Sequence, residues 1–234
     1  SGTLAGLAEA MRAAGRLEEA EALFNEATEA IASAAGNGHP GLVPSLRGLA
    51  SVFRDQGRSR DAEAILERAL AIAEQTLGPG HPTVASVLQQ LGLLYDWEGR
   101  YEEAEAAYQR TLVILEGALG PGHPDVGRTL QSLGYLYRRI GNRADIEPLL
   151  RRSLEILIAT VGPNHPDVAA TQSNLGVLHQ WFGQYGRAET AFPDSLRHTG
   201  ADGTLASTVA PPTRPPLTVR QVDSHNSHTP SAPA

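Results

Sequence analysis

The amino-acid sequence predicts an all-α solenoid in which antiparallel helix pairs stack one after another. The dipeptide His-Pro recurs with a period of 42 residues, at 39–40, 81–82, 123–124 and 165–166. A leucine column follows the same period, at Leu7, Leu49, Leu91, Leu133 and Leu175. No segment alternates with the two-residue period of a β-strand. A fixed period of this length is typical of repeated supersecondary units that bury their apolar faces against one another.

The period divides residues 1–198 into a repeat array. A partial unit covers residues 1–38, and further units begin at residues 39, 81, 123 and 165. A column of small residues runs through the units at Ala8, Ala50, Gly92, Gly134 and Gly176. A column of large residues runs through them at Phe24, Leu66, Tyr108, Leu150 and Phe192.

Each unit is predicted to contain two helices. In the unit from His81, Pro82 suits the first turn of a helix, because the missing N–H has no helical partner there. Apolar residues then follow with helical spacing, at Val84, Val87, Leu88, Leu91, Leu94 and Tyr95. Gly99 is expected to end this helix. A second helix is predicted from Tyr101 to about Leu119, before Gly-Pro-Gly at 120–122.

The last unit departs from this pattern. Pro193 falls where the second helix is expected, and a proline inside a helix costs about 3 kcal/mol. From Thr199 the chain is rich in Pro, Ser, Thr and His and has no periodicity. Such a composition buries too little apolar surface to offset the entropy of ordering. We therefore expect residues 199–234 to form a disordered tail, either native or an out-of-frame extension.

The composition excludes several classes of protein. The net charge is −7 and there is no cysteine, which excludes a disulfide scaffold and any thiolate metal site. All basic residues are arginine, as expected of a high-GC, bacterial genome. No stretch is long and apolar enough for a membrane span. We expect a cytoplasmic protein that binds neither membrane nor nucleic acid, and whose start inside a repeat helix indicates a longer chain.

These columns resemble a known family. Leu91, Gly92, Tyr95, Gly99, Tyr101, Ala104, Tyr108 and Thr111 are similar to the tetratricopeptide pattern. The period and the linkers at 77–82, 119–126 and 162–168 resemble the kinesin light chain type of that repeat. The resemblance covers about residues 3–198 and implies a right-handed superhelix.

The resemblance also implies a function. We expect a non-catalytic scaffold that binds a peptide or partner protein in its concave groove. One alternative is a sensor or regulatory arm of a larger nucleotide-binding switch or protease. Another is a kinesin light chain-like cargo adapter, although no heptad coiled coil is present in the chain.

Nothing in the sequence predicts an active site, a cofactor or a metal centre. His39, His81, His123 and His165 recur once per unit. Stacked helices are about 8–10 Å apart, so these histidines are too far apart to share a zinc ion, whose ligands lie near 2 Å from it. We interpret them as helix-start residues. His179 occupies a column of large side chains and is expected to pack in the core.

The first helices leave one polar stripe that does not face the core, which we call the first-helix stripe. It contains Pro44, Arg47, Ser51, Arg54 and Asp55 of one unit, and Ser86, Gln89, Leu93, Asp96 and Trp97 of the next. It continues through Arg128, Gln131, Tyr135, Arg138 and Arg139, and through Ala170, Ser173, Val177, Gln180 and Trp181. The stripe contains five arginines and two aspartates, and this excess of positive charge favours an acidic partner. An equally good interpretation is that the arginines only solvate an exposed face.

Three aromatic or amide residues leave alternatives open. Trp97 and Trp181 share a column and are either binding anchors or residues that pack beneath the turn between helices; we favour packing. Asn174 lies beside the stripe, and the family resemblance implies that it contacts the backbone of a bound peptide. The candidate groove residues are Arg47, Arg54, Gln89, Trp97, Arg128, Gln131, Tyr135, Arg138, Arg139, Asn174 and Trp181.

Overall fold

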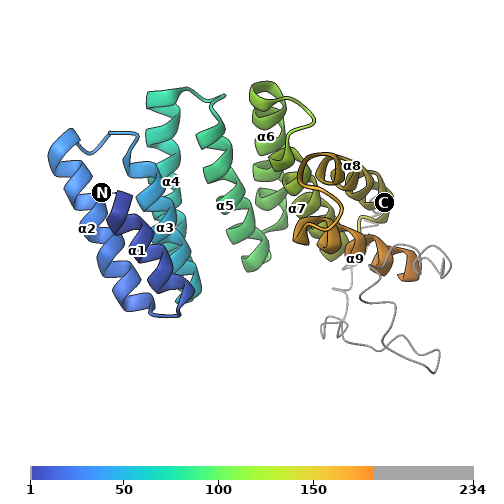
Figure 1. Ribbon diagram of the computed structural model, residues 1–234, viewed down its shortest axis with the longest axis horizontal. Helices are drawn as coiled ribbons and strands as arrows, with labels where there is room; N and C mark the ends of the chain where they lie inside the picture. The colour runs from blue at the N-terminus through green and yellow to red at the C-terminus, as the bar shows by residue number, and fades with distance from the viewer. Residues whose placement is uncertain (1, 182–234) are drawn as a thin grey trace, which may run out of the picture. The chain divides into compact units, whose positions relative to one another are not determined.

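The computed structural model describes residues 2–181, which form nine α-helices and no β-strand (Figure 1). The helices are α1 (Gly2–Ala13), α2 (Leu17–Ala35), α3 (Leu42–Asp55), α4 (Ser59–Leu77), α5 (Pro82–Glu98), α6 (Tyr101–Leu119), α7 (Pro124–Ile140), α8 (Arg143–Val161) and α9 (Pro166–Trp181). Each odd-numbered helix from α1 to α7 packs against the helix that follows it, and successive pairs pack in chain order. The predicted all-α array of helix pairs is confirmed. None of these helices combines the length and hydrophobicity of a bilayer-spanning segment.

The helix boundaries follow the local signals of the sequence. Helix α5 begins at Pro82, and Nδ1 of His81 accepts a hydrogen bond from the Thr83 N–H at 3.1 Å. Gly99 ends the helix with a φ of 79°, in the left-handed region that favours glycine. Helix α6 then spans Tyr101–Leu119, as predicted. Helix α3 begins later than its counterparts, at Leu42, because residues 40–41 form a turn.

The core lies inside and between the pairs, where the small and large columns meet. A Cβ atom on Gly92 would lie 2.6 Å from Cε1 of Tyr108, which is closer than packed atoms tolerate. The corresponding distance from Gly134 to Cδ2 of Leu150 is 2.8 Å. Glycine therefore lets the first helix approach a large residue of the second. Leu91 and Leu133 are each only 3% exposed, as predicted.

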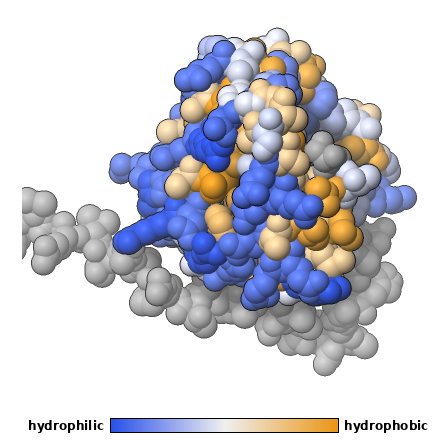
Figure 2. Space-filling view, turned by 90° about the vertical axis from the view of Figure 1, so that its left-hand side faces the viewer, coloured by the Kyte–Doolittle hydropathy of each residue, from blue (hydrophilic) through white to orange (hydrophobic). Residues whose placement is uncertain are grey.

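Leu7 is an exception within the leucine column. Its side chain is 46% exposed, whereas Leu49, Leu91, Leu133 and Leu175 are buried. Among the described residues, α1 has extended contacts only with α2 and α3, so one side of it lacks a neighbouring pair. Figure 2 looks at the end formed by α1 and α2 and shows hydrophobic residues scattered among hydrophilic ones.

The first helices also touch one another along the array. Helix α3 contacts α1 and α5, and α7 contacts α5 and α9. The second helices of the described part share no contact of that extent. The first-helix stripe therefore runs across neighbouring helices of one layer.

Two predictions concern the C-terminal part of the chain. The disordered tail at 199–234 and the interruption at Pro193 both lie outside the described residues. Within them, α8 contains Pro148 near its N-terminal end, and the helix continues through it to Val161. The Pro148 side chain is exposed.

Candidate functional site

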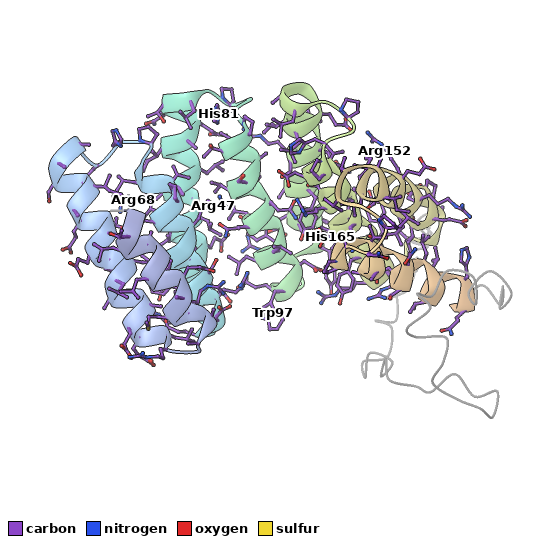
Figure 3. All side chains as sticks on the ribbon, in the orientation of Figure 1. Arg47, Arg68, His81, Trp97, Arg152 and His165 are labelled. Atoms are coloured by element: carbon purple, nitrogen blue, oxygen red, sulfur yellow. The ribbon has the colours of Figure 1, made fainter. Side chains whose placement is uncertain are left out.

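The first-helix stripe is carried by four helices. Arg47 and Arg54 lie on α3, and Gln89 and Trp97 lie on α5. Arg128, Gln131, Tyr135, Arg138 and Arg139 lie on α7, and Asn174 lies on α9. Trp181 is the last residue of α9, and its side chain lies outside the described part. Figure 3 shows Arg47 beside α5 and Trp97 at the C-terminal end of α5.

Three of the five stripe arginines are already paired with carboxylates of the chain. Arg54 pairs with Asp55 at 3.0 Å. Arg128 binds Asp125 and Asp167, each at 2.7 Å, and these hydrogen bonds raise the pKa of its guanidinium. The two aspartates lie at the starts of α7 and α9, outside the first-helix stripe. The excess of five arginines over two aspartates along the stripe is therefore partly neutralised by neighbouring carboxylates.

Arg139 forms the third pair, with the buried side chain of Asp96. Its NH1 group donates to Oδ1 of Asp96 at 2.9 Å and to the backbone oxygen of Asp96 at 3.0 Å. The guanidinium also lies 5.2 Å from the ring centre of Tyr101. Asp96 is only 8% exposed, so placing it on an exposed stripe was wrong. The pair belongs to the packing between α5 and α7.

The electrostatics of this pair are dominated by the burial of the acid. Burial raises the pKa of Asp96, and the nearby positive charge of Arg139 offsets only part of that rise. The pKa of Arg139 is also raised, although its own burial acts in the opposite direction. Because the side chain of Asp96 is the more buried of the two, the loss of water around its carboxylate dominates the electrostatics of the pair.

Arg47 has no carboxylate partner among the described residues. Its Nε donates to Oε1 of Gln90 on the neighbouring helix α5 at 3.0 Å. Nε2 of Gln90 in turn donates to the Ser51 hydroxyl at 3.3 Å. The guanidinium is half-buried, and desolvation lowers the pKa of Arg47. A partly desolvated cation that is held only by a neutral amide is a favourable site for an incoming carboxylate.

Arg138 is the second stripe arginine without a carboxylate partner in the described part. Its guanidinium lies over the Tyr135 ring, 4.5 Å from the ring centre. Its NH1 group donates to Oδ1 of Asn174 at 3.3 Å. Asn174, which the family resemblance assigns to a bound peptide, is thus occupied in part by Arg138. The stacked, planar guanidinium keeps further N–H groups for a ligand.

The amides of the stripe are partly used between repeats. Nε2 of Gln89 donates to the Ser132 hydroxyl at 3.0 Å, while its buried Oε1 has no hydrogen-bond partner among residues 2–181. Nε2 of Gln131 donates to the backbone oxygen of Asp167 at 3.4 Å. Buried acceptors are normally satisfied, so Oε1 of Gln89 marks a place where a donor from outside the chain would be stabilising.

Large apolar side chains lie exposed beside these polar groups. Trp97 is 76% exposed, so the favoured interpretation that it packs beneath the turn is wrong. Leu93 is 40% exposed on the same helix, one turn before Trp97, and Tyr135 is 42% exposed on α7. Sequence reasoning missed this exposure because the periodic pattern shows only that a residue leaves the core face. Exposed aromatic side chains are the usual anchors of protein interfaces.

His81 and His123 are the N-cap residues of α5 and α7, and His39 and His165 form the same kind of hydrogen bond just before α3 and α9. Each of the four accepts a backbone N–H at Nδ1, in support of the helix-start interpretation. No group of three potential metal ligands is found within the described part. His179 is 4% exposed and lies in the core, as predicted.

Comparison with protein families identifies the repeat. Residues 1–75, 47–98 and 84–159 match the family described as tetratricopeptide repeat, and a second profile of the same description matches residues 168–197. No protein of curated function matches the chain.

Solved structures give the same picture of the fold. The kinesin light chain TPR-like repeats of Podosopora anserina are 25% identical, with a TM-score of 0.68 over 81% of this chain and 89% of that one. BtubC (BKLC) from P. vanneervenii is also 25% identical, with a TM-score of 0.72 over 80% of this chain and 75% of that one. MamA, at 16% identity and a TM-score of 0.53 over 79% and 90% of the two chains, shares the fold alone.

Proposed function

Because the chain belongs to the tetratricopeptide repeat family, we propose that it is a non-catalytic scaffold that binds an extended, acidic segment of a partner protein along the first-helix stripe. The repeats and their structural relatives support protein interaction as the general role. Solenoids of this kind usually bind on their concave layer. The direct contacts between successive first helices support their assignment to that layer.

The observation that carries the proposal is the pair of uncompensated guanidiniums, Arg47 and Arg138. Neither forms an ion pair within the described residues, while Arg54, Arg128 and Arg139 do. A ligand carboxylate can therefore bind Arg47 or Arg138 without displacing one from the chain. Such charge-assisted hydrogen bonds are shorter and stronger than neutral ones.

The apolar part of the stripe lies between these two arginines. Helix α5, with Leu93 and Trp97, contacts both α3 and α7. A segment that reaches from Arg47 to Arg138 would cross α5 and pass these side chains. We infer a partner segment with acidic residues on both sides of one or more apolar residues, whose burial would supply affinity.

A peptide titration tests this proposal. A labelled peptide of alternating glutamate and leucine is expected to bind at least about tenfold more tightly than its lysine counterpart at low salt. Raising the ionic strength should weaken binding of the acidic peptide, because exposed charges are screened over about 10 Å at 0.1 M salt. The double variant Arg47→Gln, Arg138→Gln should lose the preference, as measured by fluorescence anisotropy.

Arg68 provides the matched control. It lies on the second helix α4, is exposed, and forms no ion pair within the described residues. Arg68→Gln removes the same charge and should change the affinity by less than about twofold. Equal binding of the two peptides by the parent protein would contradict the proposal, and so would an equal loss in the Arg68 variant.

The likeness to kinesin light chain repeats favours one further candidate, an adapter that joins a partner protein to a larger assembly. At 25% identity this role remains a proposal. It would use the same stripe, so the titration tests its binding step as well. Co-purification of a second protein with the full chain, lost in the Arg47 and Arg138 double variant, is the result expected of an adapter.

A further inference from the structure

A small pocket lies between α3, α4 and α5 and opens on the first-helix stripe. Its floor is formed by buried apolar side chains, among them Ala50, Leu66 and Leu94. Its rim is formed by partly buried polar side chains, namely Ser51, Arg54 and Gln90. Two of these rim residues, Ser51 and Arg54, belong to the stripe. The enclosed part of the pocket has room for about one water molecule, or for a methyl group of similar size.

The pocket exists because its unit has a leucine, Leu66, where both neighbouring units have an aromatic residue. In the unit of residues 1–38 the aromatic residue is Phe24, which lies so close to α3 that a Cβ atom on Gly48 would overlap its ring. Gly48 is the counterpart of the rim residue Gln90, 42 residues earlier in the chain. The Phe24 ring therefore fills the space that corresponds to the pocket.

Tyr108 fills the corresponding space in the unit of residues 81–122. Its side chain is buried, and its ring packs against Gly92, the counterpart of Ala50. Burial raises the pKa of Tyr108, and the negative charge of Asp96, the counterpart of Arg54, adds to that rise. The ring thus reaches from the floor of its unit toward the rim. Leu66 is shorter than either ring, and the space beyond it stays open.

The polar rim is already bonded within the chain. The Ser51 hydroxyl donates to the backbone oxygen of Arg47 at 3.1 Å and accepts from Nε2 of Gln90 at 3.3 Å. Nε and NH2 of Arg54 both donate to Oδ1 of Asp55. A polar side chain that entered the pocket would lose water and gain little in exchange. The apolar floor therefore decides which side chain fits.

Gln90 joins the pocket to the guanidinium of Arg47, because its Oε1 accepts from Nε of Arg47 at 3.0 Å. Arg47 and Ser51 lie one turn apart on α3, which is about 6 Å along the helix. Alternate residues of an extended peptide lie on the same face, about 7 Å apart. An extended segment can therefore place one carboxylate on Arg47 and the side chain two positions away in the pocket.

We propose that this pocket is a specificity subsite for one small aliphatic side chain of the partner segment, alanine or valine, two positions from an acidic residue bound by Arg47. The inference rests on the proposed function, because it concerns the same partner segment. Burial of methyl groups on the apolar floor is favourable. An aromatic side chain exceeds the space, and overfilling a packed site is unfavourable.

Peptides of the form Glu-Ser-X-Ser-Glu test the subsite when they are titrated against the full chain by fluorescence anisotropy. Valine and threonine at X have the same shape and differ in one hydroxyl group. The valine peptide should bind about tenfold more tightly than the threonine peptide, because an apolar pocket discriminates against the hydroxyl. A tryptophan peptide should bind no more tightly than the threonine peptide. Equal binding of valine and threonine, or tightest binding of tryptophan, would overturn the inference.

The double variant Ala50→Gly, Leu66→Tyr closes the pocket with the pair that the next unit has at Gly92 and Tyr108. In this variant the valine and threonine peptides should bind equally. The threonine peptide should bind as it does to the parent protein, because Arg47 is unchanged. A preference for valine that persists in the variant would place the side chain elsewhere and would overturn the inference.

Two further measurements separate the subsite from the proposed function. If the parent protein binds Lys-Ser-Thr-Ser-Lys as tightly as the glutamate peptide, the proposed function fails, and with it the spacing to Arg47. If the acidic preference is present but valine and threonine bind equally, the subsite alone fails. NMR contacts between the valine methyl groups and those of Leu66 and Leu94 are expected in the complex with the parent protein. Their absence at saturation would overturn the inference, even if the double variant did not fold.

Discussion

Truncation of Leu133 to alanine is expected to lower the free energy of unfolding by about 2–5 kcal/mol. Leu133 is 3% exposed on α7 and packs in one cluster with Tyr108, Tyr137 and Leu150. Its loss would leave a cavity between α7 and its neighbours, because the close-packed side chains around it can relax only in part. Urea unfolding followed by circular dichroism measures the change.

Leu93→Ala is the matched control for this prediction. Leu93 is the same residue type in the middle of a first helix, but its side chain is 40% exposed. Its truncation should cost less than about 1 kcal/mol. A loss below about 1 kcal/mol for Leu133→Ala would contradict the assignment of the leucine column to the core.

Replacement of Arg139 by glutamine is expected to cost about 2–3 kcal/mol at neutral pH, somewhat less than for a fully buried pair. The side chain of Arg139 is itself one-third exposed, but its partner Asp96 is buried. Without the guanidinium, the carboxylate would remain in the core with no cation to compensate it. The double variant Asp96→Asn, Arg139→Gln removes the stranded charge and should be more stable than the single variant.

The pH dependence of the single variant gives a second measurement. Burial raises the pKa of Asp96 in the folded protein above its value in the unfolded chain. The folded state then binds more protons, so the stability contributed by this group falls as the pH rises through the raised pKa. The deficit of Arg139→Gln relative to the double variant should therefore shrink at pH 5 and grow at pH 8. A deficit independent of pH would show that the ion pair is not its cause.

Arg138→Gln separates surface charge from this buried pair. Arg138 stacks on an exposed tyrosine and neutralises no carboxylate of the described part. Its replacement should alter stability by less than about 0.5 kcal/mol. Of these two neighbouring arginines, only Arg139 is therefore expected to matter for the stability of the fold, because only Arg139 compensates a buried carboxylate.

Most of the fold could be predicted because the same pattern of residues recurs in each repeat unit. The second helix predicted from Tyr101 to Leu119 has those bounds in the structure. The burial of Leu91 and Leu133 also follows from a column that keeps leucine in every unit. A position that is apolar in every unit is identified as a core position more surely than one that is apolar in a single helix. The repeated units therefore give several independent observations of each core position.

The candidate site was predicted less well, because a repeated column shows which positions are equivalent but does not show which charged side chains pair. Arg12 binds Asp55 at 2.7 Å, and Asp96 binds Arg139 at 2.9 Å, each across 43 residues. The periodic pattern does not predict these partners, which lie one residue beyond the 42-residue period. The count of charges also missed the partners of Arg128, because Asp125 and Asp167 lie outside the first-helix stripe. The exposure of Trp97 was also out of reach, since it depends on what its neighbours leave uncovered.

Two of the ion pairs between first helices of neighbouring units, Arg12–Asp55 and Asp96–Arg139, have opposite polarity, which makes the order of the units chemically distinguishable. From α1 to α3 the arginine comes first, at Arg12, and from α5 to α7 the acid comes first, at Asp96. Exchange of residues 81–122 with residues 123–164 would bring Arg54 opposite Arg139 and would separate both members of the second pair. Units that are similar in sequence are therefore not interchangeable in position, because each exchange that cuts such a pair leaves a charged side chain without its partner.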